Sequence, residues 1–468
     1  MRQKFHSQQP LFDNFEALYP AVTFMTDEEL KGISHILDSI PEILDLIAED
    51  LRTVIKSRSG RGAVTIEQVL RSAILRQRKH YSYRELADRI ADSINYRHFT
   101  RFMGQPIPHF TTFEKLINAI RPETWKKIND LLVDYASRTR KSGGGKIENG
   151  KALRLDTTVI ETNIAYPVDA RLLLDSVRVL TRMLRFCRLD LGITSFFFSS
   201  RMRRVKKRSY QIVLLKGPNA QKKRRKLYRD LLKATAEVIN MAEEALPKLH
   251  KALSQDIQNK DIQGVVSGFE HFLPLVHKAV DQCRRRVLDG EKVPAEEKIV
   301  SIFEEHTDII CRGKSGSPVE FGHKTLFCTG KSGLITQYDV FRGNPGDNTM
   351  LEKALEIHKK QFGHAPDKLA GDRRFFSADN EEMAETEGVK YVCLPKPGRL
   401  SADRKQWQKT RWFKALQRFR AGIEGNISTL LRSFGLKRCF WKGWEAFKSY
   451  VGLGSVTYNL RKIVVLAA

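Results

Sequence analysis

Apolar residues recur at helical spacing through the first 140 residues of the chain, which predicts a helical N-terminal region. Thr65-x-x-Gln68 and Ser82-x-x-Glu85 each match a capping box, in which two side chains satisfy free N–H groups at a helix start. Two short predicted helices, 82–90 and 93–103, are joined by a tight turn and match a helix-turn-helix. Residues 58–62, Arg-Ser-Gly-Arg-Gly, are interpreted as a linker after a first helical segment.

From residue 152 onward, strand and helix patterns alternate. A first strand is followed by a long, charged helical stretch from about 171 to 300, and then by a hairpin and further strand–helix pairs. This order predicts an α/β fold with a helical insertion after its first strand. The predicted strands are 152–162, 319–328, 334–341, 368–370 and 389–394, and the later predicted helices are 348–362, 377–387 and 408–434.

The charge of the chain narrows its class of partner. The 468 residues carry 81 Lys or Arg against 54 Asp or Glu, a net charge of +27. Such an excess favours a polyanion, and because no apolar run could span a bilayer, we expect nucleic acid rather than a membrane. The six cysteines form no Cys-x-x-Cys pair, and no secretory signal opens the chain, so we expect a cytoplasmic, nucleoid-associated protein.

Basic residues are concentrated within the helical insertion. Residues 201–229 hold 13 Lys or Arg and no acid. A run of this kind is commonly a solvated surface, but the interleaved Tyr210 and Tyr228 favour contact with a phosphate backbone.

Three carboxylates stand in contexts that suggest chemistry. Asp156 lies in a strand-like run, Asp372 follows another, and Glu424 lies within the helix predicted at 408–434. Three carboxylates brought together repel one another unless a cation neutralises them, and hard oxygen ligands suit Mg²⁺ or Mn²⁺. Singly, each acid has a structural explanation: a turn for either Asp, or a pair with Arg420 for Glu424. Gly422 and Gly425 flank Glu424, although glycine destabilises the interior of a helix. We interpret these glycines as leaving room for the close approach of a substrate or another backbone.

The sequences around these acids resemble those of the DDE transposases of bacterial insertion sequences. The resemblance rests on Asp-Thr-Thr-Val at 156–159, Gly-Asp-Arg-x-Phe-x-Ser at 371–377, and Arg420-x-x-x-Glu424. Phe-Arg-Gly-Asn-Pro-Gly-Asp at 341–347 is similar to the family's turn after its third core strand. The resemblance covers roughly residues 60 to 465.

This resemblance implies a ribonuclease-H-like core and a metal-dependent reaction. Asp156, Asp372 and Glu424 would hold two Mg²⁺ ions, which Mn²⁺ could replace, and these would drive cleavage of DNA and attack of the freed 3′-hydroxyl on target DNA. The implied partners are double-stranded DNA, both the terminal inverted repeats and the target, and a second copy of the chain in a homodimer or larger assembly. The implied domains are an N-terminal segment (1–58), a helix-turn-helix-like DNA-binding domain (59–140), a catalytic domain (141–170 with 301–468) and a basic helical insertion (171–300).

Several cations are candidates for DNA contact. Arg420 and Arg432, near Glu424, could grip a phosphate. The other candidates are Arg373, Lys396, Lys324, Arg97 and Arg101. His323 is interpreted as structural, and Trp441 and Trp444 as packing for the C-terminal helix rather than as base-stacking residues.

Three positions depart from the family pattern. Gln417 and Leu431 replace a Tyr and a Lys. Arg374 replaces a small residue, and its bulky side chain could crowd the loop if the backbone there needs a positive φ. Two alternatives therefore stay open: a decayed, non-catalytic DNA-binding regulator, and a nuclease of the same fold without strand transfer.

Overall fold

The computed structural model describes residues 27–53, 64–141, 143–218, 220–311 and 319–468. The chain forms two compact units, one of residues 1–162 with 322–468 and one of residues 163–321. The interpreted linker 58–62 lies outside the described residues.

The first unit begins with helices whose starts are fixed by their own side chains. Both predicted capping boxes are present, at Thr65–Gln68 and Ser82–Glu85. The helices are α3 (Glu28–Asp38), α4 (Glu42–Arg52), α5 (Ile66–Lys79), α6 (Tyr83–Asp92), α7 (Ile94–Thr100), α8 (Phe110–Ile117) and α9 (Pro122–Arg138).

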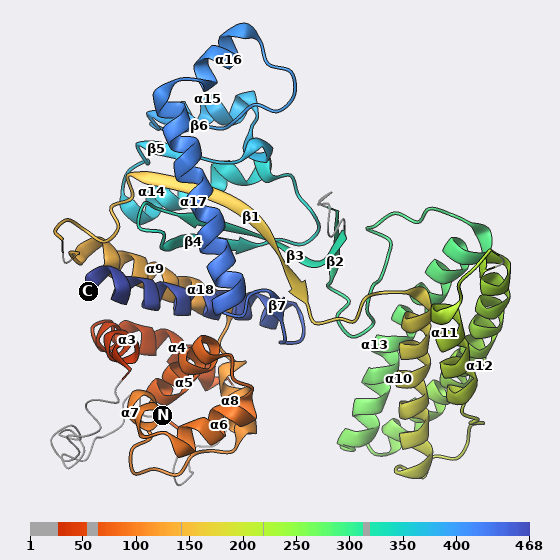
Figure 1. Cartoon of the computed structure of the whole chain (residues 1–468). Coiled ribbons are helices and arrows are strands. Elements are labelled where there is room, and N and C mark those ends of the chain that lie inside the picture. The colour runs from red at the N-terminus through yellow and green to blue at the C-terminus, as the bar shows by residue number, and fades with distance from the viewer. Residues whose placement is uncertain (1–26, 54–63, 142, 219, 312–318) are drawn as a thin grey trace. The chain divides into compact units, whose positions relative to one another are not determined.

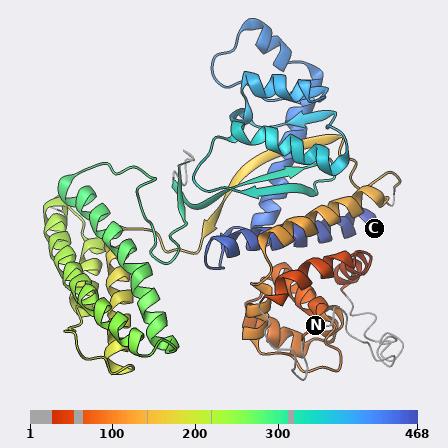
Figure 2. The ribbon, with the colours of Figure 1, turned by 180° about the vertical axis from the view of Figure 1, so that it is seen from behind.

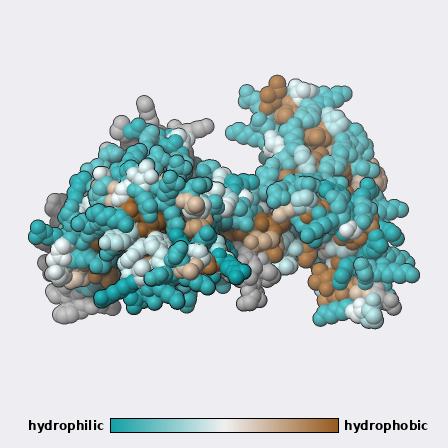
Figure 3. Space-filling model, turned by 90° about the horizontal axis from the view of Figure 1, so that it is seen from above, coloured by the Kyte–Doolittle hydropathy of each residue, from teal (hydrophilic) through white to brown (hydrophobic). Residues whose placement is uncertain are grey.

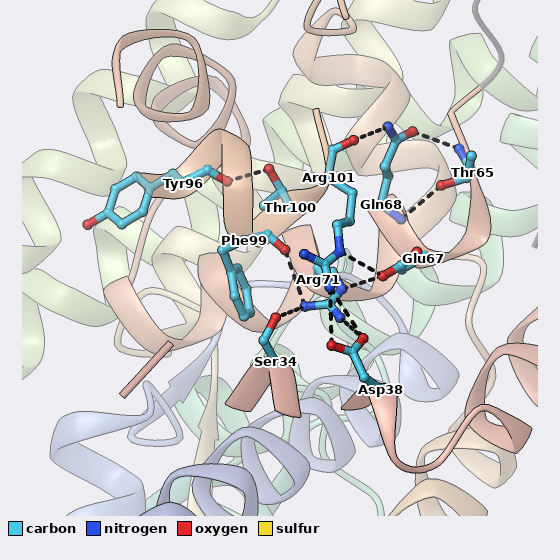
Figure 4. A network of polar contacts seen from close by, with 10 residues as sticks. All are labelled: Ser34, Asp38, Thr65, Glu67, Gln68, Arg71, Tyr96, Phe99, Thr100 and Arg101. Atoms are coloured by element: carbon cyan, nitrogen blue, oxygen red, sulfur yellow. Dashed lines mark hydrogen bonds and ion pairs between the residues drawn. The ribbon is translucent and has the colours of Figure 1, made fainter. Parts of the chain in front are cut away.

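A partly buried ionic network joins three of these helices (Figure 4). Arg71 of α5 is almost fully buried, and its guanidinium donates to Glu67 at 2.8 Å and to Asp38 of α3 at 2.5 Å. Arg101, directly after α7, donates to the same two carboxylates at 3.1 Å each. Burial, and then the charge of Arg101, lowers the pKa of Arg71. Because a buried charge is costly without partners, this network ties α3, α5 and α7 together.

A mixed sheet follows, in the order β2-β3-β1-β5-β6, with β4 on β3 and β7 on β1. β1 pairs antiparallel with β3 and parallel with β5, and β5 pairs parallel with β6. This mixed sheet matches the ribonuclease-H-like core that the family resemblance implied. The strands are β1 (Ala152–Thr162), β2 (Asp308–Cys311), β3 (Val319–Thr329), β4 (Ile335–Val340), β5 (Lys368–Ala370), β6 (Tyr391–Cys393) and β7 (Arg438–Cys439).

Helices cover both faces of this sheet (Figures 1 and 2). On one face, Leu153 and Leu155 of β1 pack with residues of α14 (Leu351–Phe362) and α15 (Ala378–Thr386). The alternate β1 side chains, Arg154 and Asp156, reach α17 (Arg411–Ser433) on the other face. Successive strand residues point to opposite faces, so this alternation places Asp156 under α17. The remaining elements here are η3 (Asp347–Met350), η4 (Arg373–Phe375), α16 (Ala402–Gln408) and α18 (Trp444–Ala467).

The N-terminal helices share a core with the sheet. Apolar residues of α3 to α9 form one buried cluster with residues of β4, α17 and α18. α18 lies beside α9 and is buried along most of its length (Figures 1 and 2).

In its described residues, the second unit has four α-helices around a separate apolar core. They are α10 (Asp169–Leu189), α11 (Met202–Leu214), α12 (Ala220–Gln255) and α13 (Lys260–Cys283), which continues into the π-helix η2 (Arg284–Asp289). None of the described helices in either unit is long and apolar enough to cross a membrane.

Candidate active site

Asp156 lies on β1, and Asp372 lies two residues beyond the end of the neighbouring strand β5. Arg154 of β1 pairs with Ala370 of β5 in a parallel ladder, and each Asp follows its paired residue by two positions. Residues of the same parity on adjacent strands share a face of the sheet. The backbone therefore brings these two carboxylates to the same end of the sheet from segments 216 positions apart in sequence.

Arg420 joins Asp156 to Glu424. Its guanidinium donates to Oδ2 of Asp156 at 2.8 Å and to Oε1 of Glu424, one helical turn on, at 2.7 Å. The other Asp156 oxygen accepts the N–H of Thr157 at 2.8 Å. Asp156 is buried, whereas the Glu424 side chain is 61% exposed. One carboxylate is thus fixed in place while the other is accessible from solvent.

Asp372 is positioned by the turn that follows β5. Its Oδ1 accepts the N–H of Arg374 at 2.8 Å and so caps the short helix η4. Arg374 has no positive φ, because His80 and Arg101 are the only non-glycine residues with positive φ in the described chain. The expectation that Arg374 crowds this loop is therefore wrong.

The chemistry of these side chains fits a divalent cation. All three offer hard carboxylate oxygens, the ligands that Mg²⁺ and Mn²⁺ prefer. In the described residues, no three His, Cys, Asp or Glu side chains converge closely enough to form a metal site. A positive group nevertheless already lies between Asp156 and Glu424, since the Arg420 guanidinium binds both.

Gly422 has a different role from the one that its position beside Glu424 suggested. A Cβ on Gly422 would lie 2.2 Å from Nη1 of Arg154. That guanidinium crosses from β1 to α17, where it donates to the Phe419 carbonyl oxygen at 2.6 Å. Gly422 therefore makes room for a side chain of the protein itself, while a Cβ on Gly425 would meet only open space.

A buried acid beside the site has no counterpart among the predicted site residues. Asp347 accepts from Nζ of Lys324 at 2.8 Å and from Oγ1 of Thr157 at 3.0 Å. Both charged side chains are almost fully buried, at 6% exposed for Lys324 and 1% for Asp347. Thr157 directly follows Asp156, so this pair supports the strand that carries the first carboxylate. The signal in the sequence was Asp347 at the end of the turn motif 341–347.

The candidate DNA-contact residues fall into two groups. Arg373, Lys396 and Arg432 are exposed. Lys324 is held by Asp347, Arg101 by Glu67 and Asp38, and Arg97 donates to two backbone carbonyls. The second group is thus engaged within the fold, and only the first presents free surface to a phosphate.

Trp441 and Trp444, which follow β7, pack against other side chains of the protein. Trp441 is buried, and Trp444 lies edge-on to the buried His323 at 4.7 Å between ring centroids. His323 also contacts Phe447 of α18 at 4.7 Å. The interpretation of these residues as packing is confirmed.

The basic run of the insertion divides by face. Arg204 and Arg208 pair with Asp230 of α12, and Arg201 pairs with Glu237. Tyr228 lies in the core of the helical unit, but Tyr210 is exposed. Part of the run therefore holds the helices together, so its charge is not wholly available to a partner.

Two family models match the chain. The model described as "Transposase DDE domain" matches residues 286–460, which include Asp372 and Glu424. The model described as "Transposase domain (DUF772)" matches residues 25–119, the N-terminal helices. Comparisons with curated proteins and with solved structures gave no match. The two matched regions together span more than half of the chain, and the chain belongs to the DDE transposases of insertion sequences.

Proposed function

We propose that this transposase cuts DNA at the ends of its element and joins the freed 3′-hydroxyl ends to target DNA. Asp156, Asp372 and Glu424 are the proposed catalytic carboxylates and metal ligands. The observation that carries the proposal is that Arg420 binds both Asp156 and Glu424, while the β1–β5 register brings Asp372 to the same strand end.

Each residue has a distinct part in this proposal. Bound Mg²⁺ ions, or Mn²⁺ in their place, would supply the charge that stabilises an in-line displacement at phosphorus. The Thr157 N–H and the Arg420 guanidinium orient the Asp156 carboxylate. Arg420 is also placed to bind a non-bridging phosphate oxygen, because a guanidinium offers several donors. The exposed Arg373, Lys396 and Arg432 are proposed to contact the DNA backbone, which positions a duplex without reading its sequence.

The test is cleavage of a labelled duplex carrying the element's own ends, with Mg²⁺ or Mn²⁺. Asp156→Asn keeps the size of the side chain and removes its charge, so it should abolish cleavage and leave DNA binding intact. Asp379→Asn, an exposed acid of the nearby α15, is the matched control and should cut normally. Cleavage by Asp156→Asn at the wild-type rate would disprove the assignment.

The same assay separates the two alternatives. A substrate pre-cut to expose the 3′-hydroxyl should be joined to target DNA by a transposase but not by a simple nuclease. Metal-independent binding with no product would favour a decayed regulator. The structure gives that alternative little support at Arg374, which fits its turn, or at Leu431, which packs against the core.

A dimer or larger assembly is proposed because two element ends must be joined together.

A further inference from the structure

The helical unit carries a groove that the proposed reaction does not use. It has a volume of about 820 Å³ and lies between the start of α10 and one face of α11. Five of its lining side chains are apolar or aromatic, and exposed hydrophobic residues are visible on the surface of this unit in Figure 3. The volume is in the range of roughly 300–1,000 Å³ that is typical of pockets for small ligands, so it can admit a nucleotide.

The cations of this groove form no ion pair with the described part of the chain. Arg203, Lys206 and Lys207 line it from α11, and Arg171 lines it from α10. They differ in this from Arg201, Arg204 and Arg208, which are neutralised by acids of α12. Helix α11 therefore has one charged face committed to folding and another that is open to an anion.

Two exposed aromatic rings lie among these cations. Tyr166 is 74% exposed and Tyr210 is 66% exposed, and both line the groove. On α11, Tyr210 follows Arg203, Lys206 and Lys207 at spacings of seven, four and three, so the ring shares their face. Exposed rings beside unpaired cations match what single-stranded nucleic acid needs: an aromatic surface for each base and positive charge for the phosphates.

We propose that this groove binds unpaired nucleotides of single-stranded DNA, with bases stacked on Tyr166 and Tyr210. Duplex DNA fits these features less well, because its base faces are already stacked and only its phosphates would meet the cations. A protein partner would have to be acidic to match Arg171 and the α11 cations. The inference rests on the proposed function only in that DNA is the substrate, and it assigns the unpaired strand to a site in the helical unit.

The test is binding of a labelled oligothymidylate to the full-length protein. All measurements are made in the Asp156→Asn background without divalent metal, so the result is independent of catalysis. Stacking on an aromatic ring contributes about 1–3 kcal/mol per base, so Tyr166→Ala and Tyr210→Ala should each weaken binding by roughly tenfold. Tyr210→Phe should bind like the parent because it keeps the ring.

Two controls separate stacking from other effects. Phe197→Ala removes another exposed aromatic side chain of the same unit, outside the groove, and should not change binding. Lys206→Gln should reduce the salt dependence of oligothymidylate binding, whereas Arg208→Gln, whose parent side chain is paired with Asp230, should not.

Three outcomes would overturn the proposal. The first is unchanged oligothymidylate binding in the double variant Tyr166→Ala/Tyr210→Ala. The second is an equal loss of duplex binding, which would make the groove a phosphate-contact surface. The third is a change in the sedimentation of the double variant without a change in its DNA binding, which would make the groove an interface between copies of the chain. Loss of cleavage in Asp156→Asn bears on none of these, so the two proposals can fail separately.

Discussion

At the scale of single residues, the site depends on charged groups that neutralise one another away from water. Asp156 is fixed by Arg420 and by the backbone of Thr157, and Thr157 is in turn bonded to Asp347. Strand β1 is thus supported by an ion pair at Asp156 and by a hydrogen bond at Thr157. Only the pair of Arg420 with Glu424, one turn apart on a helix, could be inferred from spacing, whereas the contact of Arg420 with Asp156 forms only in the folded chain.

The pair of Lys324 and Asp347 gives a residue-scale prediction. Lys324→Met leaves the Asp347 carboxylate buried without its cation, which should lower the free energy of unfolding by about 3–5 kcal/mol. Lys324→Met/Asp347→Leu removes both charges and should recover most of that loss, apart from the hydrogen bond to Thr157. Urea unfolding of the parent, both single variants and the double variant measures the coupling. If the loss of unfolding free energy in the double variant equalled the sum of the losses in the two single variants, the pair would not be coupled.

At the scale of elements, helix α17 offers a matched pair of glycines. Gly422→Ala would press a methyl group against the Arg154 guanidinium, which three hydrogen bonds hold in place. We expect a loss of about 1–3 kcal/mol in the free energy of unfolding, as for overpacking in a core. Gly425→Ala meets nothing and should instead stabilise the helix by about 1 kcal/mol. Denaturant unfolding of both variants is the measurement, and equal effects at the two positions would refute this explanation.

Helix α14 carries a histidine that makes stability depend on pH. His358 is buried, and its Nε2–H donates to the Gly150 carbonyl oxygen at 2.8 Å. Burial, and to a lesser extent the nearby His364, lowers the pKa of His358 to about 4. In the unfolded chain the pKa is about 6.5, so between these values the unfolded state binds a proton that the folded state does not. Stability should therefore fall as pH decreases from about 6.5 to 4, by roughly 2–3 kcal/mol in total.

His358→Gln isolates this contribution. Glutamine can still donate to Gly150 but does not titrate, so the difference between variant and parent removes the effect of every other group. Urea unfolding at pH 7 and again near pH 4.5 should show a smaller loss of stability in the variant. The same loss in both proteins would show that His358 is not responsible.

The elements themselves were predictable where the signal is local. Both capping boxes and strand β1 were predicted from neighbouring residues, because caps and alternation are fixed within a few positions. The short strands β2 and β7 were not predicted: two to four residues carry little periodicity, although β5, of three residues, was predicted. Gly422 was misinterpreted for a similar reason: the side chain that requires it, Arg154, lies far away in sequence and contacts it only in the folded chain.

At the scale of the whole molecule, the net charge of +27 is only partly available to DNA. Arg71, Arg101 and Lys324 neutralise acids within the first unit, and Arg204 and Arg208 do so in the second. The sequence alone could not make this distinction, because the acids that pair with each cation lie on other elements. The exposed cations are therefore the ones that should determine how DNA binding responds to salt.

This distinction predicts the salt dependence of duplex binding. Each phosphate contact contributes about 0.9 to the slope of log K against log salt concentration, through release of counterions. Arg432→Gln should reduce that slope by about one, since its side chain is exposed on α17. Arg101→Gln should leave the slope unchanged and lower the stability of the protein instead, because Arg101 forms ion pairs with Glu67 and Asp38. Titrations of a labelled duplex at several salt concentrations give the slopes, and an equal change for both variants would mean that exposure does not identify the DNA-binding cations.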